Sequence, residues 1–401
     1  MAESTAARTV RDVVCAFCGL GCDDLVVEVE GRAVRPAANV CAEAARLLSR
    51  SGTDAVPAAP EAYERARAIL AGARAPLFAG LGTDVNGVRA ILDLARTTGG
   101  VLDHAASDAL FRNYASTQRT GWLATTLAEV RNRCDVLLVI GNDPTPAFGR
   151  LFERLFPASP LFTGARRVIF LGGEPGARAQ AQLAGATVTT IPADDLVAAT
   201  ATLAGVVAGR AGEGPLAEVA SALKGAAYAV VTWNAAELDA GDLIAERATA
   251  IVDTLNKTTR AGVFPLGGRD NIIGVNQVLL WRLGYPLRTA IRGEISAHDG
   301  DLFAADVAMR DADVLVWVSA FRPDPPPARL LDGFKGRVIV IGHPETVFDS
   351  EPDVFIPVGT PGIDHAGTVF RMDSIVSLPL GALRVATLPG VAEAVRRIAG
   401  G

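Results

Sequence analysis

Short apolar runs recur along most of this chain, and several of them end in glycine, asparagine or aspartate. They occupy residues 75–80, 136–141, 167–172, 228–233, 314–319 and 338–342. Helical stretches, such as residues 60–73 and 85–97, alternate with these runs. Short runs that stop at turn residues are typical of buried parallel strands. The alternation therefore predicts an α/β fold with doubly wound sheets, more than one over 401 residues.

Composition narrows the class of protein. Half of the residues are hydrophobic and a fifth are charged, which is ample for a large core. No apolar run approaches the roughly 18 residues that span a bilayer, and the N-terminal MAESTAARTV lacks the apolar core of a secretion signal. The net charge of −6 argues against a nucleic-acid partner. We expect a cytoplasmic protein that binds neither nucleic acid nor a membrane.

Four of the five cysteines lie within the first 41 residues, at Cys15, Cys18, Cys22 and Cys41. In the reducing cytosol, grouped cysteines indicate a metal site rather than disulfides. Their number suits an iron–sulfur cluster or a structural zinc ion, and the residue types do not separate the two. The alternative interpretation is that they are small buried hydrophobic residues.

The first 50 residues predict a small β-rich cap around these cysteines. Residues 24–35 alternate apolar and polar side chains around Gly31, which predicts a β-hairpin. Residues 39–50 read as a helix with Cys41 near its start. Further along, residues 194–224 are alanine-rich and predict helix, whereas the proline-rich residues 323–327 predict a loop.

Three other features allow either a functional or a purely structural interpretation. The loops at 80–84 and 141–144 follow predicted strands, where nucleotide-like ligands bind in open sheets, but every such unit needs a turn. Residues 265–286 place a polar, flexible loop before an apolar helix, as an anion site or a capped helix start would. The scattered histidines show no metal-binding spacing and are expected to be structural; they are His104, His298, His343 and His365.

Several blocks of sequence resemble the B subunit of formylmethanofuran dehydrogenase, a member of the molybdopterin oxidoreductase family. The first is CAFCGLGCDDLVVEVEGRAV, at residues 15–34. LAEVRNRCDVLLVIGNDPTPAF (127–148), GGRDNIIGVNQVLLWRLGYP (267–286) and IPVGTPGIDHAGTVFRMD (356–373) follow in the family's order. The resemblance thus runs over nearly the whole chain.

The resemblance implies a fold and a set of ligands. The fold is a small cysteine-containing cap followed by doubly wound α/β domains of the molybdopterin-oxidoreductase type. The expected divisions are a cap at 1–50, an α/β domain at 51–105 and 256–401, and an inserted α/β domain at 106–255. By resemblance, the 4Fe-4S ligands are Cys15, Cys18, Cys22 and Cys41.

One departure from the family concerns its redox metal. The family uses a Cys-His pair upstream of the second block, and the cysteine ligates molybdenum or tungsten. Alignment without gaps puts that pair at about Ala109 and Leu110, where neither side chain can bind a metal. Cys134, at a predicted strand start, is a poor substitute. We therefore expect no molybdenum or tungsten pterin, although a vestigial 4Fe-4S cluster is compatible with the cysteines.

This departure indicates a sister group, the formyltransferase/hydrolase complex of aerobic methylotrophs. That complex transfers formyl from formyltetrahydromethanopterin to a methanofuran-like carrier and releases formate. The resemblance implies that this chain is its B subunit, a structural component without an active site of its own. Its partners would be the A subunit, which is an amidohydrolase, together with the C and D subunits, which carry the formyltransferase.

Two alternatives belong to other functional classes. The first is a working metallopterin subunit of a formylmethanofuran or formate dehydrogenase with a non-cysteine ligand. A formate-like anion would then be held by arginines at Arg269, Arg288 and Arg292. The second is a small redox or zinc sensor built on the cysteine cap, which the length of the chain and the family blocks disfavour.

Overall fold

The computed structural model describes residues 7–49 and 55–400, and the chain forms two compact units. The first unit runs up to Ser107 and resumes at Gly268, and the second is the insertion Asp108–Gly267. The insertion thus ends later than the predicted residue 255, because β10 (Ala261–Leu266) pairs with a strand of the inserted sheet. Over the described ranges, no helix combines the length and apolar character needed to cross a bilayer.

The first unit begins with the cysteine cap. Its antiparallel strands are β1 (Arg8–Val13), β2 (Leu25–Glu30) and β3 (Ala33–Ala38), and α1 (Ala42–Ser49) follows. The predicted hairpin is confirmed. The predicted helix is confirmed over Ala42–Ser49, but residues 39–41, with Cys41 among them, precede it, and residue 50 lies outside the described residues. Strand β1 was not predicted, because this charged edge strand is mostly exposed and carries no apolar alternation.

A seven-stranded sheet forms the body of the first unit, in the order β12-β11-β5-β4-β13-β14-β15. Its strands are β4 (Pro76–Gly82), β5 (Gly100–Leu102), β11 (Thr289–Arg292), β12 (Ile295–His298), β13 (Val314–Ser319), β14 (Arg337–Gly342) and β15 (Val354–Pro357). A separate hairpin is formed by β16 (Gly367–Phe370) and β17 (Ser377–Leu380). The sheet is parallel from β5 to β15, and antiparallel β11 and β12 close one edge.

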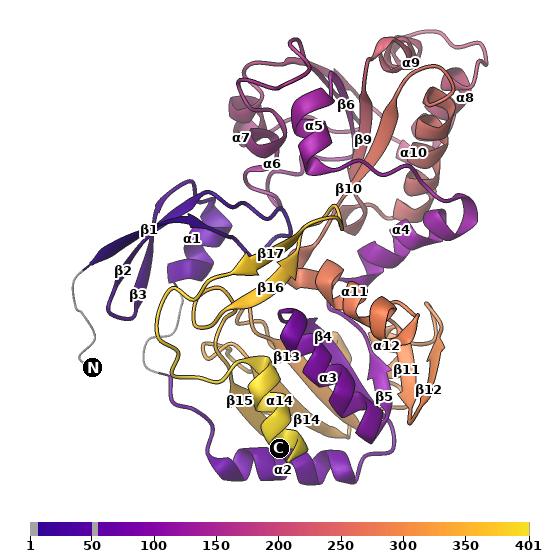
Figure 1. Ribbon diagram of the computed structural model, residues 1–401. Helices are drawn as coiled ribbons and strands as arrows, with labels where there is room; N and C mark the ends of the chain where they lie inside the picture. The colour runs from indigo at the N-terminus through magenta and orange to yellow at the C-terminus, as the bar shows by residue number, and fades with distance from the viewer. Residues whose placement is uncertain (1–6, 50–54, 401) are drawn as a thin grey trace. The chain divides into compact units, whose positions relative to one another are not determined.

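Helices cover this sheet. They are α2 (Pro60–Ala71), α3 (Val85–Thr98), α11 (Ile272–Leu283), α12 (Ala305–Ala308), α13 (Ala328–Leu331) and α14 (Val391–Ala399). On one face, Leu77, Leu315 and Trp317 form a core against α12 and α13. Figure 1 shows α3 and α14 side by side in front of the sheet, where they pack against each other. The loop predicted at 323–327 is confirmed and leads into α13.

The second unit holds a parallel five-stranded sheet in the order β10-β9-β6-β7-β8. The other strands are β6 (Val136–Ile140), β7 (Arg167–Leu171), β8 (Thr187–Ile191) and β9 (Ala229–Asn234). The helices are α4 (Ser107–Thr120), α5 (Leu127–Arg133), α6 (Leu151–Leu155), α7 (Ala177–Gln182), α8 (Leu196–Val207), α9 (Pro215–Gly225) and α10 (Gly241–Leu255). In Figure 1, α8, α9 and α10 group on one side of this sheet, where their apolar faces join the core. The predicted helical stretch 194–224 is two helices, because Gly209 and Gly214 adopt positive φ between them.

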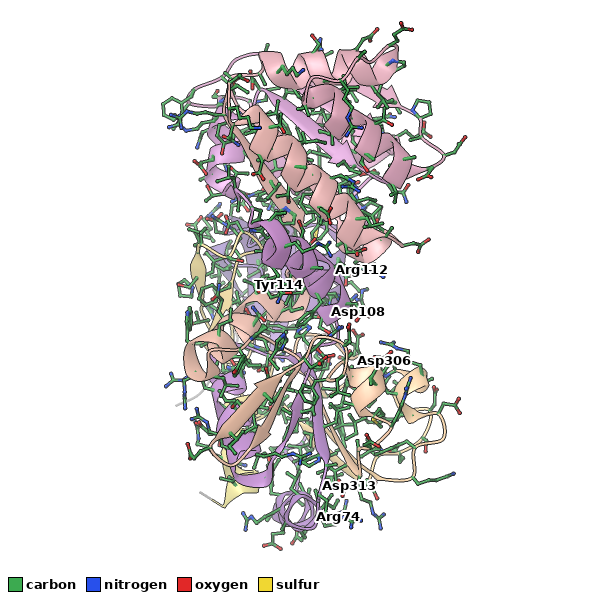
Figure 2. The ribbon with its side chains drawn as sticks, turned by 90° about the vertical axis from the view of Figure 1, so that its right-hand side faces the viewer. Arg74, Asp108, Arg112, Tyr114, Asp306 and Asp313 are labelled. Carbon is green, nitrogen blue, oxygen red and sulfur yellow. The ribbon has the colours of Figure 1, made fainter. Side chains whose placement is uncertain are left out.

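Both units wind in the same way, and the predicted α/β class is confirmed. Strand order reverses between β4 and β13 in the first unit and between β6 and β9 in the second. At each reversal, an aspartate just before one strand accepts hydrogen bonds from two backbone N–H groups just before the other. Asp313 accepts from residues 74 and 75 at 2.8 and 3.0 Å, and Asp135 accepts from residues 227 and 228 at 2.8 and 2.9 Å. Figure 2 labels Asp313 and Arg74 at the first of these bridges.

We expect Asp313→Ala to loosen the amino ends of β4 and β13, and Asp135→Ala to do the same for β6 and β9. Each change leaves two backbone donors without their acceptor, which costs about 1–3 kcal/mol. Peptide-level hydrogen–deuterium exchange should show faster exchange in the affected unit and unchanged exchange in the other. Asp306→Ala, on an exposed aspartate of α12, is the matched control. Equal exchange in Asp313→Ala and Asp306→Ala would contradict a bridging role.

Candidate functional site

The four clustered cysteines come together in the cap, on a loop between β1 and β2 and just before α1; they are Cys15, Cys18, Cys22 and Cys41. The N–H of Cys15 donates to the carbonyl of Cys22 at 2.8 Å, which closes the loop. Gly21 has φ of 61°, and a Cβ there would lie 2.5 Å from the Leu378 side chain. The loop therefore depends on glycine at this position, both for its backbone conformation and for its contact with β17.

The thiols share one environment. Cys15 and Cys22 are buried, and Cys18 and Cys41 are half-buried. Burial raises the pKa of Cys15 well above its usual value, and the neighbouring thiols of Cys18, Cys22 and Cys41 raise it further. Burial likewise raises the pKa of Cys18 to about 11. The thiols of Cys15 and Cys18 are therefore neutral at pH 7, and metal binding would have to release their protons.

The residue types leave the kind of metal site open. Four grouped cysteines with glycine-rich turns suit a 4Fe-4S cluster or a structural zinc ion. Among the described residues, no group of three or more His, Cys, Asp or Glu side chains is spaced to hold one metal ion. The assignment of the quartet as 4Fe-4S-type ligands stays a prediction.

A buried arginine, Arg322, holds the cysteine loop against the body of the first unit. Its Nη2 donates to the carbonyl of Phe17 at 3.1 Å, between Cys15 and Cys18. Its Nε donates to Asp270 Oδ1 at 2.7 Å, and its Nη1 donates to Glu43 of α1. Only 4% of the Arg322 side chain is exposed. One guanidinium thus contacts three parts of the first unit: the cysteine loop, helix α1 and Asp270 in the segment 265–286.

In the segment 265–286, the polar side chains of Asp270 and Asn271 make hydrogen bonds within the first unit. Asp270 and Asn271 adopt positive φ of 53° and 63°, an uncommon backbone conformation that surrounding contacts must hold. The Asn271 amide donates to the carbonyl of Thr83 at 2.8 Å and accepts from the N–H of Phe370 at 2.9 Å. Asn271 therefore joins three segments, and its side chain does not cap α11. Anion binding at this helix start stays a prediction.

His104 belongs to the same buried network. Its Nδ1 accepts from the N–H of Ala106 at 3.0 Å, so its Nε2 carries the proton and faces the carbonyl of Asp270 at 3.3 Å. Burial lowers the pKa of His104 to about 4. The remaining histidines also hydrogen-bond backbone through their rings, in keeping with structural roles; they are His298, His343 and His365.

The two glycine-ended loops act as connections in the structure. Strand β4 continues through Gly80 to Gly82, and Asp84 caps α3 by accepting from two backbone N–H groups. In the second unit, Asp143 accepts from Thr145 and from the N–H of Gly176. These carboxylates stabilise turns, which is the structural interpretation of both loops.

The position expected for the family's metal-binding cysteine lies in the first turn of α4. The Ala109 side chain packs against the hydrophobic core of the second unit. Arg112, one turn later, donates to the carbonyls of Ala235 and Leu238 at 2.7 and 2.8 Å and fixes the helix (Figure 2). Cys134 is fully buried just before β6, at the amino end of that strand. Neither position offers an accessible thiolate.

The three arginines proposed for a formate-like anion do not converge. Arg269 is 55% exposed and pairs with Asp324. Arg288 is buried and donates to the carbonyl of Gly300 at 2.6 Å. Arg292 is exposed at the hairpin end of β11, four residues and therefore roughly 13 Å farther along the strand. This arrangement does not support the dehydrogenase alternative.

Sequence reasoning missed the residues that organise the site. Arg322 follows a predicted strand and precedes a proline-rich loop, a position where arginine is ordinarily exposed. Asp270 and Glu43 carry no motif of their own. Asp103, which is buried, accepts from the N–H of Ala305 at 2.8 Å, and burial raises its pKa to about 6. A buried charged residue whose partners are distant in the chain cannot be recognised from the local sequence.

Comparison with known proteins identifies homologues of the chain. It matches no protein-family model. It is 29% identical, over 77% of its length and 84% of the relative's, to the Fhc B subunit of the formyltransferase/hydrolase complex of Methylorubrum extorquens. It is 27% identical to the B subunit of tungsten-containing formylmethanofuran dehydrogenase 2 of Methanocaldococcus jannaschii, with 92% of each chain covered.

A solved structure gives the same relationship. The crystal structure of the formyltransferase/hydrolase complex (FhcABCD) from Methylorubrum extorquens with methylofuran contains a chain that matches with a TM-score of 0.74 and 27% identity. The match covers 86% of this chain and 96% of that chain. The chain is thus a homologue of the B subunit of formylmethanofuran dehydrogenase. It is equally a homologue of the Fhc B subunit of the formyltransferase/hydrolase complex.

We expect the free energy of unfolding to fall as the pH drops from about 6.5 to about 4, partly through His104. The unfolded histidine takes up a proton across this window, whereas the folded one resists because protonation would set Nδ1–H against the Ala106 N–H. Urea titrations across this pH range should show a smaller fall for His104→Gln than for the wild type.

Asp103 supplies the control, because its raised pKa acts in the opposite direction. Its folded form binds a proton more readily than its unfolded form, so it gains stability on acidification. Asp103→Asn should therefore steepen the fall with decreasing pH. Identical pH slopes for His104→Gln and the wild type would show that His104 is not held neutral by the fold.

Proposed function

We propose that this chain is a non-catalytic, architectural subunit of a formyltransferase/hydrolase complex. The proposal is supported by homology with the Fhc B subunit over 84% of that protein. The single observation that argues against redox catalysis is the residue at position 109. Ala109 packs against the hydrophobic core at about the position where the family resemblance expects a metal-binding thiolate. An alkyl side chain has no lone pair to give to molybdenum or tungsten.

The reaction that this protein would serve belongs to one-carbon metabolism in methylotrophic, formaldehyde-oxidising cells. Formyl would pass from formyltetrahydromethanopterin to a methanofuran-type carrier at the C and D subunits, and the A subunit, an amidohydrolase, would release formate. The present chain would hold these cytoplasmic partners in place and shape the path of the carrier. Its two doubly wound units, each built around a buried hydrophobic core, are suited to that role.

The cysteine quartet has a structural role in this proposal. A cluster bound there would cross-link the cap, because Cys41 and the loop that carries Cys15, Cys18 and Cys22 belong to different segments. When bound, a 4Fe-4S cluster would supply one-electron transfer, but Ala109 stands at about the position where the family resemblance expects the cysteine that binds a neighbouring redox metal. The chain's own residues would bury the cluster and anchor its loop through Arg322.

The purified complex, obtained by co-expression of this chain with the A, C and D subunits, tests the proposal. We expect the four proteins to co-purify, and formate release to persist when cells are grown without tungstate and molybdate. Elemental analysis should give no stoichiometric tungsten or molybdenum, whatever the content of iron and zinc.

Two results would overturn the proposal. One is stoichiometric tungsten or molybdenum on this chain together with viologen-linked formate oxidation, which would indicate a working dehydrogenase. The other is failure of this chain to associate with the A, C and D subunits under conditions in which those three assemble with the Fhc B subunit.

A further inference from the structure

The cysteine site consists of two pieces of chain that a single side chain joins. Phe17 lies in the loop of Cys15, Cys18 and Cys22, and its carbonyl accepts from Arg322 at 3.1 Å. Glu43, in the first turn of α1 and two residues after Cys41, pairs with the same guanidinium. The third partner of Arg322 is Asp270, whose N–H donates to the Phe17 carbonyl at 3.2 Å.

These contacts form an alternating chain of charges that is buried at its centre. Arg46 pairs with Glu43 at 2.9 Å, and Arg269 pairs with Asp270 at 3.0 Å. The outer arginines are 46% and 55% exposed, whereas the side chain of Arg322 is 4% exposed. Each carboxylate is thus shared between a buried and an exposed arginine. A planar guanidinium with five donors satisfies two carboxylates and a carbonyl at once, which a lysine ammonium cannot do in the same directions.

Two further protein contacts hold the loop in addition to Arg322. The N–H of Met372 donates to the Gly19 carbonyl at 2.7 Å. Gly268 also lies so close that a Cβ there would be 2.9 Å from the Cα of Gly19. Backbone contacts and the Arg322 side chain together seat the loop on the body of the first unit.

We propose that Arg322 is a positioning residue that preassembles the four-cysteine site by clamping the Cys15–Cys22 loop and the Cys41 helix onto Asp270. The clamp holds the thiols together in the metal-free chain. A cluster or metal ion would then bind to a gathered site and would not have to fold it. This inference concerns the chain alone and does not rest on the proposed role in a complex.

The test measures thiol reactivity in the full-length chain, reduced and stripped of metal with a chelator. Iodoacetamide labelling at one pH, read by mass spectrometry for each cysteine, reports how often the site opens. Arg322→Lys keeps the positive charge beside the thiols but cannot make the three contacts. We expect Cys18 and Cys41 to react at least about tenfold faster in this variant, because a buried ion-pair network is broken.

The chain offers an internal and a matched control. Cys134 is fully buried in the second unit, so its continued protection shows that this unit is folded. Unchanged hydrogen–deuterium exchange over β4 and β13 shows the same for the body of the first unit. Arg269→Lys makes the same exchange at an exposed arginine that also pairs with Asp270, and should leave the labelling rates unchanged. Glu43→Gln weakens only the helix side of the clamp, so Cys41 should become more reactive than Cys18.

Arg322→Lys labelling rates at Cys18 and Cys41 that equal those of Arg269→Lys would overturn the proposal. Full protection in Arg322→Lys together with exposure in Arg322→Gln would also overturn it, because charge alone would then be sufficient. If Arg322→Lys also exposes Cys134, the variant has unfolded, and the labelling rates of Glu43→Gln then test the proposal. Selective labelling of Cys41 with Cys134 protected supports the clamp, and wild-type rates at Cys41 refute it.

Discussion

The ion-pair network centred on Arg322 is the interaction on which the organisation of the first unit depends. It joins the cap to the body of the unit at the carboxyl end of β13, beside the point where strand order reverses. Burying a guanidinium is costly unless its hydrogen bonds are satisfied. Asp270, Glu43 and the Phe17 carbonyl supply those partners. If the cysteine loop moved, the buried Arg322 guanidinium would lose the Phe17 carbonyl as a partner. The free-energy cost of that loss favours one position of the loop.

The position of this network also bears on the ligand chemistry of the fold. In open α/β sheets, ligands bind outside the carboxyl ends of the strands, where the strand order reverses. In the first unit, Asp270 lies beside Gly82 at the end of β4, where a Cβ would be 3.5 Å from the Asp270 Cβ. Residues that a ligand would contact in a binding protein are here engaged with one another. A scaffold role is consistent with that engagement.

The two units share one pattern of strand order. Each reverses its strand order once, and each ties the amino ends of its two central strands through an aspartate, Asp313 or Asp135. The two units share this bridge for a geometric reason. The backbone N–H groups just before one central strand need an acceptor, and the aspartate just before the neighbouring strand supplies it.

Local periodicity and residue type were sufficient to predict the α/β class, the central strands, the cap hairpin and the cysteine grouping. They did not determine β1, the end of the insertion or the role of Arg322. Those depend on which segments pair across long separations, as when β10 joins β9 or residue 322 meets residue 17. The cysteines were identified from spacing alone, whereas the charges that seat them became visible only in the tertiary structure. The physical reason is that burial of a charge depends on partners distant in the chain, and local pattern carries no information about them.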